Sequence, residues 1–228
     1  MKATLLSTAD LAPGVRHFCF EVLGVDQFTF VPGQFVSLVN TLDGSEYTRA
    51  YSVASPPGGN RFELCLNLVP DGLFSAYLFS LTAGAQLEVT PPLGYFTLRR
   101  RDRDVLMIAT GTGIAPFRSI LENSLHELTG RATLLFGTRY EQGILYQGEW
   151  ADLERRYRNF QFWPTLTRAT PAWTGRTGRV QAHLEEALAG RTDIDVYLCG
   201  LKEMVDDLRR LLKQKGLDRK QIIYEKYD

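Results

Sequence analysis

The stretch Val-Leu-Met-Ile-Ala-Thr-Gly-Thr-Gly-Ile-Ala-Pro, residues 105–116, decides the fold of the second half of the chain. Residues 105–109 form a continuous apolar run, which is typical of a strand buried on both faces of a sheet. The run passes through Gly111 and Gly113 into a segment whose apolar residues recur three or four positions apart, and this spacing predicts a helix. The helix-periodic residues are Ile114, Phe117, Leu121, Leu125 and Leu128.

The alternation of strand and helix continues to the end of the chain. Apolar runs predict strands at 132–136, 160–166, 196–199 and 222–224, and periodic segments predict helices near 149–157, over 180–188 and from Leu201 to a stop at Gly216. Strands that alternate with helices form parallel sheets. We therefore expect an α/β, doubly wound, five-stranded parallel sheet at residues 104–228.

The first hundred residues have a different periodicity. Phe18, Phe20 and Val22 alternate with polar neighbours, as in a half-buried strand, and further short strands are expected at 35–39, 50–53, 62–69 and 87–89. Proline and glycine turns separate them, and one helical segment, 75–81, interrupts them. Short strands at this spacing predict a small antiparallel β-barrel at residues 1–99, so two domains follow, with the charged stretch 99–104 as their boundary.

Composition excludes several classes of function. Lys plus Arg and Asp plus Glu both number 26, so no net charge draws the chain toward nucleic acid or an acidic membrane. The amino-terminal segment has no sustained apolar run, and no stretch reaches the length of a membrane span. Cys19, Cys65 and Cys199 lie far apart in apolar surroundings and predict reduced thiols in a cytoplasmic protein without a metal site. We expect a monomer.

The turn at Gly111 and Gly113 is the first candidate for function. Two glycines let the backbone approach a pyrophosphate at the amino terminus of the following helix, although many such turns serve packing alone. The third glycine of the dinucleotide fingerprint is absent. The acid that would hold an NAD ribose is also missing, since Phe136 is followed by Gly137, Thr138 and Arg139. An ordinary dehydrogenase is therefore a poor fit.

Two further signals lie in the β half. Within Arg49-Ala50-Tyr51-Ser52, a cation and an aromatic ring share one face of a strand, which suits a flavin nucleotide, but a barrel strand with a polar edge has the same pattern. Gly72-Leu73-Phe74-Ser75 opens the only helix of this half. It predicts either a second anion site or a plain helix cap.

Taken in order, the motifs resemble those of the ferredoxin–NADP reductase superfamily, and most closely its bacterial single-chain ferredoxin or flavodoxin reductases. The resemblance covers nearly the whole chain. It rests on Pro32-Gly33-Gln34-Phe35, Arg49-Ala50-Tyr51-Ser52, Gly72-x-x-Ser75, Gly94-Tyr95-Phe96, Gly111-Thr112-Gly113-Ile114-Ala115-Pro116 and Cys199-Gly200.

The resemblance implies a set of FAD contacts in the first half. Arg49 binds the pyrophosphate, Tyr51 packs on the flavin and ribityl, and Ser52 donates a hydrogen bond near flavin N5. Cys65 departs from the aromatic residue often found at its position. The full set implied for FAD is Arg49, Ala50, Tyr51, Ser52, Cys65, Leu66, Asn67, Leu68, Gly72, Leu73, Phe74, Ser75, Thr112 and Tyr227.

For the nicotinamide half, the resemblance implies that Thr167, Arg168 and Arg179 bind the 2′-phosphate that distinguishes NADPH from NADH. Two guanidiniums and a hydroxyl make a good phosphate site, and a solvated surface pair of arginines is the alternative. The NADP(H) set is completed by Gly111, Gly113, Pro116, Gly200, Leu201 and Met204. The implied catalytic residues are Ser52, Cys199 and Glu225, with Tyr227 as a lid over the flavin or, alternatively, packed at the sheet edge.

The expected activity is hydride transfer between NADP(H) and FAD, with single electrons exchanged with a ferredoxin or flavodoxin. Arg99, Arg100, Arg101 and Arg103 form a basic cluster that either docks such an acidic carrier or is a solvated linker. One alternative is an NADH-dependent reductase that feeds an oxygenase. Another is a flavin-binding electron-transfer or regulatory subunit without nicotinamide turnover, and a third is a cofactor-free interaction module.

Overall fold

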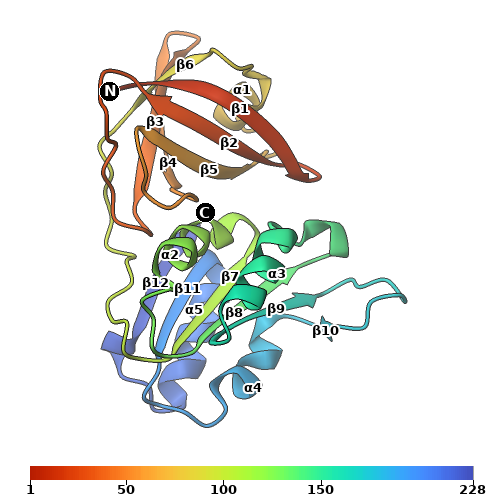
Figure 1. The fold of residues 1–228 in the computed structure, drawn as a ribbon. Coiled ribbons are helices and arrows are strands. Elements are labelled where there is room, and N and C mark those ends of the chain that lie inside the picture. The colour runs from red at the N-terminus through yellow and green to blue at the C-terminus, as the bar shows by residue number, and fades with distance from the viewer. Residues whose placement is uncertain (228) are drawn as a thin grey trace. The chain divides into compact units, whose positions relative to one another are not determined.

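The computed structural model describes residues 1–227, and the chain divides into two compact units. The first comprises Met1–Leu98 with Ala115–Asn123, and the second comprises Arg99–Ile114 with Ser124–Asp228. Figure 1 shows the antiparallel strands of the first and the parallel strands of the second.

The first unit is a curled antiparallel sheet of six strands in the order β4-β3-β6-β1-β2-β5. A bridge between Val53 and Leu64 joins the two edges, so the sheet closes into a barrel. The antiparallel barrel predicted from the sequence is confirmed. Its elements are β1 (Lys2–Ala12), β2 (Val15–Val22), β3 (Phe35–Leu42), β4 (Ser45–Ser52), β5 (Arg61–Asn67), α1 (Leu73–Ser80) and β6 (Gln86–Val89).

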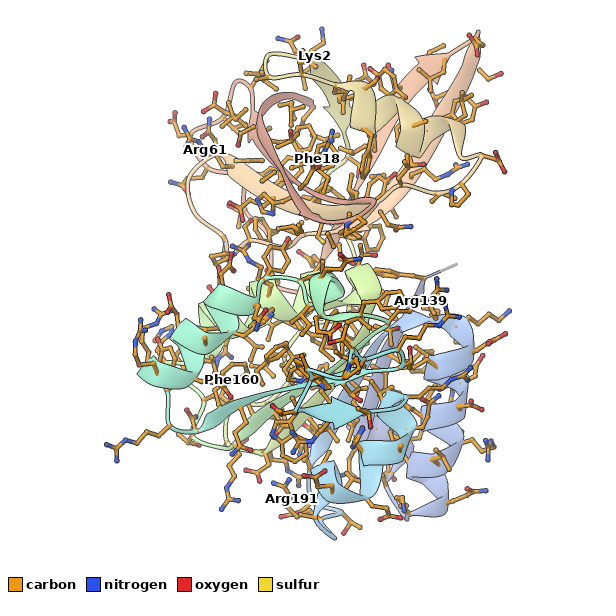
Figure 2. All side chains as sticks on the ribbon, turned by 90° about the vertical axis from the view of Figure 1, so that its right-hand side faces the viewer. Lys2, Phe18, Arg61, Arg139, Phe160 and Arg191 are labelled. Carbon is orange, nitrogen blue, oxygen red and sulfur yellow. The ribbon has the colours of Figure 1, made fainter. Side chains whose placement is uncertain are left out.

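Alternation decides which side chains fill this barrel. Phe18, Phe20 and Val22 in β2 are fully buried, as their spacing predicts, and Phe62 stacks on Phe20 from the neighbouring β5. Phe18 lies inside the barrel in Figure 2. Strand β1 was not predicted, because only its first half alternates and a register shift follows Leu5.

Helix α2 (Ala115–Ser124) groups with the first unit, although it continues directly from the glycine turn of the second. The contact that explains this is made by Arg118, whose guanidinium is almost buried. It donates to the carbonyl of Ala54 at 2.9 Å and to the carboxylate of Glu63 at 2.7 Å. The sequence prediction had placed this helix at 104–228 by continuity alone.

The second unit is a parallel sheet in the order β10-β9-β8-β7-β11-β12, with helices packed on it. The predicted doubly wound fold is confirmed, with one correction. The expected five strands become six, because β10 is a two-residue edge strand too short to show a periodicity. The strands are β7 (Val105–Thr110), β8 (Ala132–Thr138), β9 (Phe160–Leu166), β10 (Arg176–Thr177), β11 (Asp195–Leu201) and β12 (Ile222–Tyr227).

The helices of this unit follow the predicted pattern with changed ends. The helix expected over 180–188 is a 3₁₀ turn, η3, followed by a short α4, and the carboxyl end of the last helix lies at Gln214, before Gly216. Among residues 1–227, no helix is long and apolar enough to cross a membrane. The bounds are η1 (Gly111–Ile114), η2 (Glu141–Gly143), α3 (Gln147–Arg156), η3 (Val180–His183), α4 (Leu184–Leu188), α5 (Lys202–Gln214) and η4 (Arg219–Gln221).

Candidate functional site

The predicted flavin strand, β4, is mostly exposed. Arg49 and Ala50 are exposed, Tyr51 is half-buried and Ser52 is buried. Burial raises the pKa of Tyr51 to about 12, and the positive charge of Arg49 opposes that rise. The phenol is therefore neutral at physiological pH and available as a packing plane.

The structure brings the Arg49 motif and the Gly72 motif together. Tyr47 of β4 stacks on Phe74 of α1 at a ring separation of 6.3 Å, and the guanidinium of Arg49 lies over Tyr47 at 6.0 Å. Tyr47 thus links the cation of β4 to Phe74 in the first turn of a helix, where backbone N–H groups have no partner within the helix. This arrangement suits an anion such as a pyrophosphate.

Ser75 lies in the first turn of helix α1, at the start of the helix as expected. Helix α1 begins at Leu73, two residues before the predicted start, so Gly72 is the N-cap. The hydroxyl of Ser75 is occupied within the loop, since it accepts from the amide of Val69 at 3.1 Å and donates to the carbonyl of Gly72 at 3.1 Å. A Cβ on Gly72 would lie 2.8 Å from that hydroxyl. Ser75 therefore shapes the loop, and its phosphate contact stays a prediction.

Apolar side chains surround this turn without being buried. Leu66 is buried inside the barrel and Cys65 is buried on the other face of β5, whereas Asn67 at the end of the strand and Leu68 after it are exposed. Leu68, Val69 and Leu73 each expose more than two fifths of their surface. A cluster of exposed apolar residues beside an anion site fits a nucleotide with a large aromatic ring.

Two of the sequence motifs have structural roles. A Cβ on Gly33 would overlap the carbonyl oxygen of Phe96, and Gln34 donates to the carbonyl of Gly94 at 3.3 Å. The Pro-Gly-Gln-Phe and Gly-Tyr-Phe motifs therefore pack on each other within the first unit. Tyr95 between them is 92% exposed.

In the second unit, the glycine turn after β7 packs against the end of β11. A Cβ on Gly113 would overlap the carbonyl of Cys199, and a Cβ on Gly200 would overlap the hydroxyl of Thr110. Gly111 meets nothing within 4 Å and has a φ of +54°. Two of these three glycines are thus required by packing, and Gly111 by its backbone conformation. The half-exposed Thr112 and the buried Pro116 follow from this turn.

Three predicted residues meet at the carboxyl ends of β11 and β12. Cys199 lies opposite Glu225 in the parallel register, and the side chain of Tyr227 donates a hydrogen bond to the Cys199 thiol. Burial raises the pKa of Cys199 well above its ordinary value, the charge of Glu225 raises it further, and the Tyr227 hydrogen bond opposes both. The thiol is therefore neutral. Leu201 and Met204 follow at the start of α5.

The predicted phosphate-binding residues gather at the carboxyl ends of β9 and β10. Thr177 pairs with Leu166, so Thr167 and Arg168 leave the sheet beside Gly178 and Arg179. Thr167, Arg168 and Arg179 are all exposed. Within the part of the chain that the structure describes, no carboxylate pairs with either guanidinium.

Sequence reasoning missed Arg139 and Tyr140 at the end of β8. The carbonyl of Arg139 accepts from the amide of Arg168 at 2.8 Å, and the hydroxyl of Tyr140 accepts from the Arg168 guanidinium at 3.3 Å. Figure 2 shows Arg139 and Arg191 at opposite ends of the sheet's strands. The signal was the basic residue directly after a buried parallel strand, at the edge where such sheets bind ligands.

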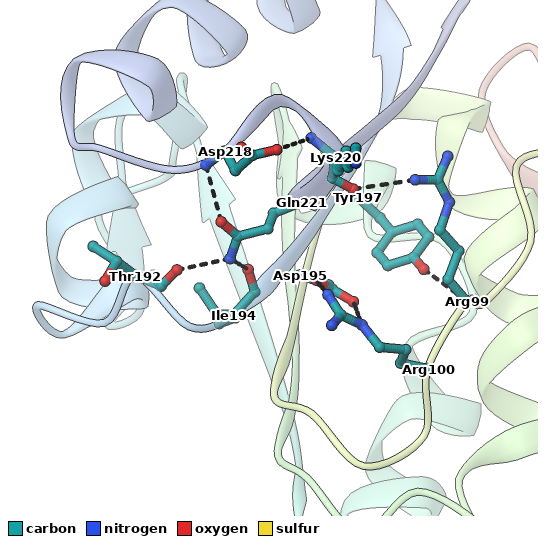
Figure 3. Close-up of polar contacts among 9 residues, drawn as sticks. All are labelled: Arg99, Arg100, Thr192, Ile194, Asp195, Tyr197, Asp218, Lys220 and Gln221. Carbon is teal, nitrogen blue, oxygen red and sulfur yellow. Dashed lines mark hydrogen bonds and ion pairs between the residues drawn. The ribbon is translucent and has the colours of Figure 1, made fainter.

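The basic cluster before β7 lies at the amino ends of the strands, the edge away from these residues. Arg100 makes two hydrogen bonds with the buried Asp195, at 2.7 and 3.0 Å. Arg99 donates to the hydroxyl of Tyr197 and to the carbonyl of Lys220, and Figure 3 shows these contacts. Arg101 pairs with Glu127. These contacts favour the linker interpretation over carrier docking.

Both units of the chain match models of known protein families. The model of an oxidoreductase FAD-binding domain matches residues 2–98, and that of an oxidoreductase NAD-binding domain matches residues 107–210. The two units therefore define a class, the oxidoreductases that bind FAD and NAD(P).

The chain belongs to the ferredoxin–NADP reductase family of this class. It is 40% identical to ferredoxin–NADP reductase B of Sorangium cellulosum, over 100% of this chain and 97% of the relative. It is 29% identical to the anthranilate 1,2-dioxygenase electron transfer component of Acinetobacter baylyi, over 89% of this chain and 60% of that protein. A ferredoxin–NADP⁺ reductase from Neisseria gonorrhoeae with bound FAD and NADP superimposes with a TM-score of 0.87, at 26% identity and coverage of 99% and 98%.

Proposed function

We propose that this oxidoreductase is specific for NADPH and exchanges electrons one at a time with an acidic carrier, a ferredoxin or a flavodoxin. The observation that carries the NADPH preference is the set of three exposed arginines, Arg139, Arg168 and Arg179, at the ends of β8, β9 and β10. Among the described residues, the nearby carboxylate of Glu141 accepts from both the amide and the hydroxyl of Thr170, so it is engaged there and would not hold the 2′-hydroxyl of NADH. Arginine forks suit a phosphate monoester.

FAD supplies the capacity to take a hydride and to release electrons singly. The residues of the first unit fit it, because Arg49 and the start of α1 suit its pyrophosphate, and exposed Leu68, Val69 and Leu73 suit its ring. Ser52 would donate near flavin N5. Tyr51 would pack on the ring system as a neutral phenol.

Gly111, Gly113 and Thr112 of the glycine turn, followed by Pro116 of α2, would line the nicotinamide dinucleotide, with Gly200, Leu201 and Met204 on the β11 side. Cys199 is a neutral, buried thiol, so its role is to occupy space and to hold Tyr227, and it takes no part as a nucleophile. Glu225 lies opposite Cys199 at this edge and would be the catalytic carboxylate there. A monomeric state and a cytoplasmic place remain predictions.

The name of the Sorangium relative supports ferredoxin as the carrier. A second candidate, an NADH-dependent reductase serving an oxygenase, is favoured by similarity to oxygenase electron transfer components. Those relatives are longer than this chain, which spans 60% and 67% of their lengths. The flavin-binding subunit without nicotinamide turnover stays the alternative of another class.

Anaerobic mixing of the flavin-loaded protein with NADPH or NADH separates the candidates. We expect bleaching of the flavin band at low NADPH concentration and only at much higher NADH concentration. Equal efficiency, or a preference for NADH, would favour the oxygenase reductase. Bleaching by neither would favour the subunit without nicotinamide turnover.

A further inference from the structure

A polar network lies directly behind Arg179, and neither the sequence motifs nor the proposed function assigns it a role. It joins β9, β10 and η3 through two side chains, Thr165 and His183. Thr165 is fully buried, and the side chain of His183 is 15% exposed. Neither residue can reach solvent freely, so their hydrogen bonds must be satisfied within the network.

The distances determine which groups of this network donate hydrogen bonds and which accept them. The Thr165 hydroxyl donates to the carbonyl of Gly178 at 2.9 Å. His183 Nε2 lies 3.0 Å from the carbonyl of Thr177 and 3.0 Å from the Thr165 hydroxyl oxygen. A carbonyl only accepts, and the threonine proton is already committed to Gly178. Nε2 must therefore carry a hydrogen and share it between these two oxygens.

This network fixes the turn that presents Arg179. Gly178 has a φ of +99°, its amide donates to the carbonyl of Leu166 at 2.8 Å, and its carbonyl is held by Thr165. Arg179 is the next residue and is the N-cap of η3. These contacts fix the backbone of Thr177 and Gly178, which precedes Arg179, while the guanidinium of Arg179 is exposed.

The neighbouring charges reinforce the same turn. Arg176 makes two bonds with Glu186 of α4, and its guanidinium stacks 3.8 Å from the ring centre of Trp163. Glu186 Oε2 lies 3.9 Å from His183 Nδ1. Arg176 and Glu186 neutralise each other, so Arg179 is the cation of this turn that is left for a ligand.

We infer that Thr165 and His183 are positioning residues that set the preference for a 2′-phosphate by fixing the Gly178–Arg179 turn. The inference rests on the proposed function, because it deepens the assignment of Arg179. Neither side chain contacts the nucleotide. A misplaced turn would weaken the contact to the 2′-phosphate alone and leave the contacts shared by NADPH and NADH intact.

The test uses Thr165→Val, which keeps the shape of threonine and removes the hydroxyl, with Thr165→Ser as the matched control. Calorimetry on the flavin-loaded protein measures binding of adenosine 2′,5′-bisphosphate and of 5′-AMP. We expect Thr165→Val to weaken the bisphosphate about tenfold, the scale of one charge-assisted contact. Binding of 5′-AMP should be unchanged, and Thr165→Ser should bind both as wild type does.

Where Thr165→Val fails to fold, His183→Leu and His183→Gln form the second pair, because a glutamine amide can replace the Nε2 hydrogen. Equal weakening of both nucleotides, or no weakening of either, would overturn the inference. Arg179→Ala is measured alongside. If it loses the bisphosphate preference while Thr165→Val and His183→Leu keep it, the positioning role is wrong and the proposed function stands. If wild type shows no such preference, both fail.

Discussion

Acid should release the ion pair that ties α2 to the barrel, and Glu63→Gln isolates that effect. The imidazole of His17, whose Nε2 lies 3.7 Å from the carboxylate, and the nearby guanidinium of Arg118 lower the pKa of Glu63 to about 2, against the opposing effect of burial. The side chain is 28% exposed, so solvent screens it only in part.

The direction of this pKa shift determines how the stability of the fold depends on pH. The pKa of Glu63 is lower in the folded than in the unfolded chain, so the carboxylate stabilises the fold above its ordinary pKa of about 4.5. That stabilisation is lost as the pH falls toward about 2. The difference of about 2.5 pH units corresponds to about 3 kcal/mol at neutral pH.

The assay is urea unfolding of wild type and Glu63→Gln from pH 7 to pH 3. Trp150, Trp163 and Trp173 all lie in the second unit, so tryptophan emission follows that unit, and release of bound flavin follows the first. We expect the two proteins to differ by about 2–3 kcal/mol at pH 7 and by only about 1 kcal/mol at pH 3. The exposed Glu88→Gln is the control. A constant difference between pH 7 and pH 3 would refute the reasoning.

Flavin released by heat should be FAD, and chromatographic recovery of FMN instead would contradict the pairing of Arg49 with the start of α1. Arg168→Ala and Arg179→Ala should each raise KM for NADPH on the order of tenfold with KM for NADH little changed, since each removes one charge-assisted phosphate contact, and equal changes would count against the site. Gly113→Ala should lower the thermal midpoint by several degrees, because its Cβ would overlap the carbonyl of Cys199, whereas Gly148→Ala, which meets nothing within 4 Å, should not. Truncation after Lys226 should tighten NADP(H) binding and shift the flavin band if Tyr227 covers the ring, and an unchanged spectrum with unchanged affinity would exclude that lid.

Periodicity in the sequence predicts the strands correctly where buried residues recur at regular intervals. Strand β9 begins at Phe160 and ends at Leu166, as expected from its apolar run, and the inward residues of β2 are those that alternate. Strand β1 was not predicted because only two of its residues, Ala3 and Leu5, are buried, and β10 because two residues are too few to show a period. Local pattern predicts elements only where a face is repeatedly buried.

The sequence predicts candidate site residues where these lie at the ends of strands. Motif order identified Arg49, Arg168 and Arg179, whereas Arg139 required the further step of asking which residues leave the same edge of the sheet. The grouping of α2 with the barrel could not be foreseen, because it depends on the partners of Arg118 in other parts of the chain. Long-range ion pairs have no local signature in sequence.

The contacts of Tyr227 likewise depend on residues far from it in the sequence. Sequence spacing gives a Glu-x-Tyr ending, which fits either a flavin lid or a residue packed at the sheet edge. In the structure its side chain is hydrogen-bonded to Cys199, whose thiol is fully buried. Any movement of the Tyr227 ring away from this position must break that hydrogen bond. Cys199 can therefore contribute to access at this edge as a neutral anchor for Tyr227, without any chemistry of its own.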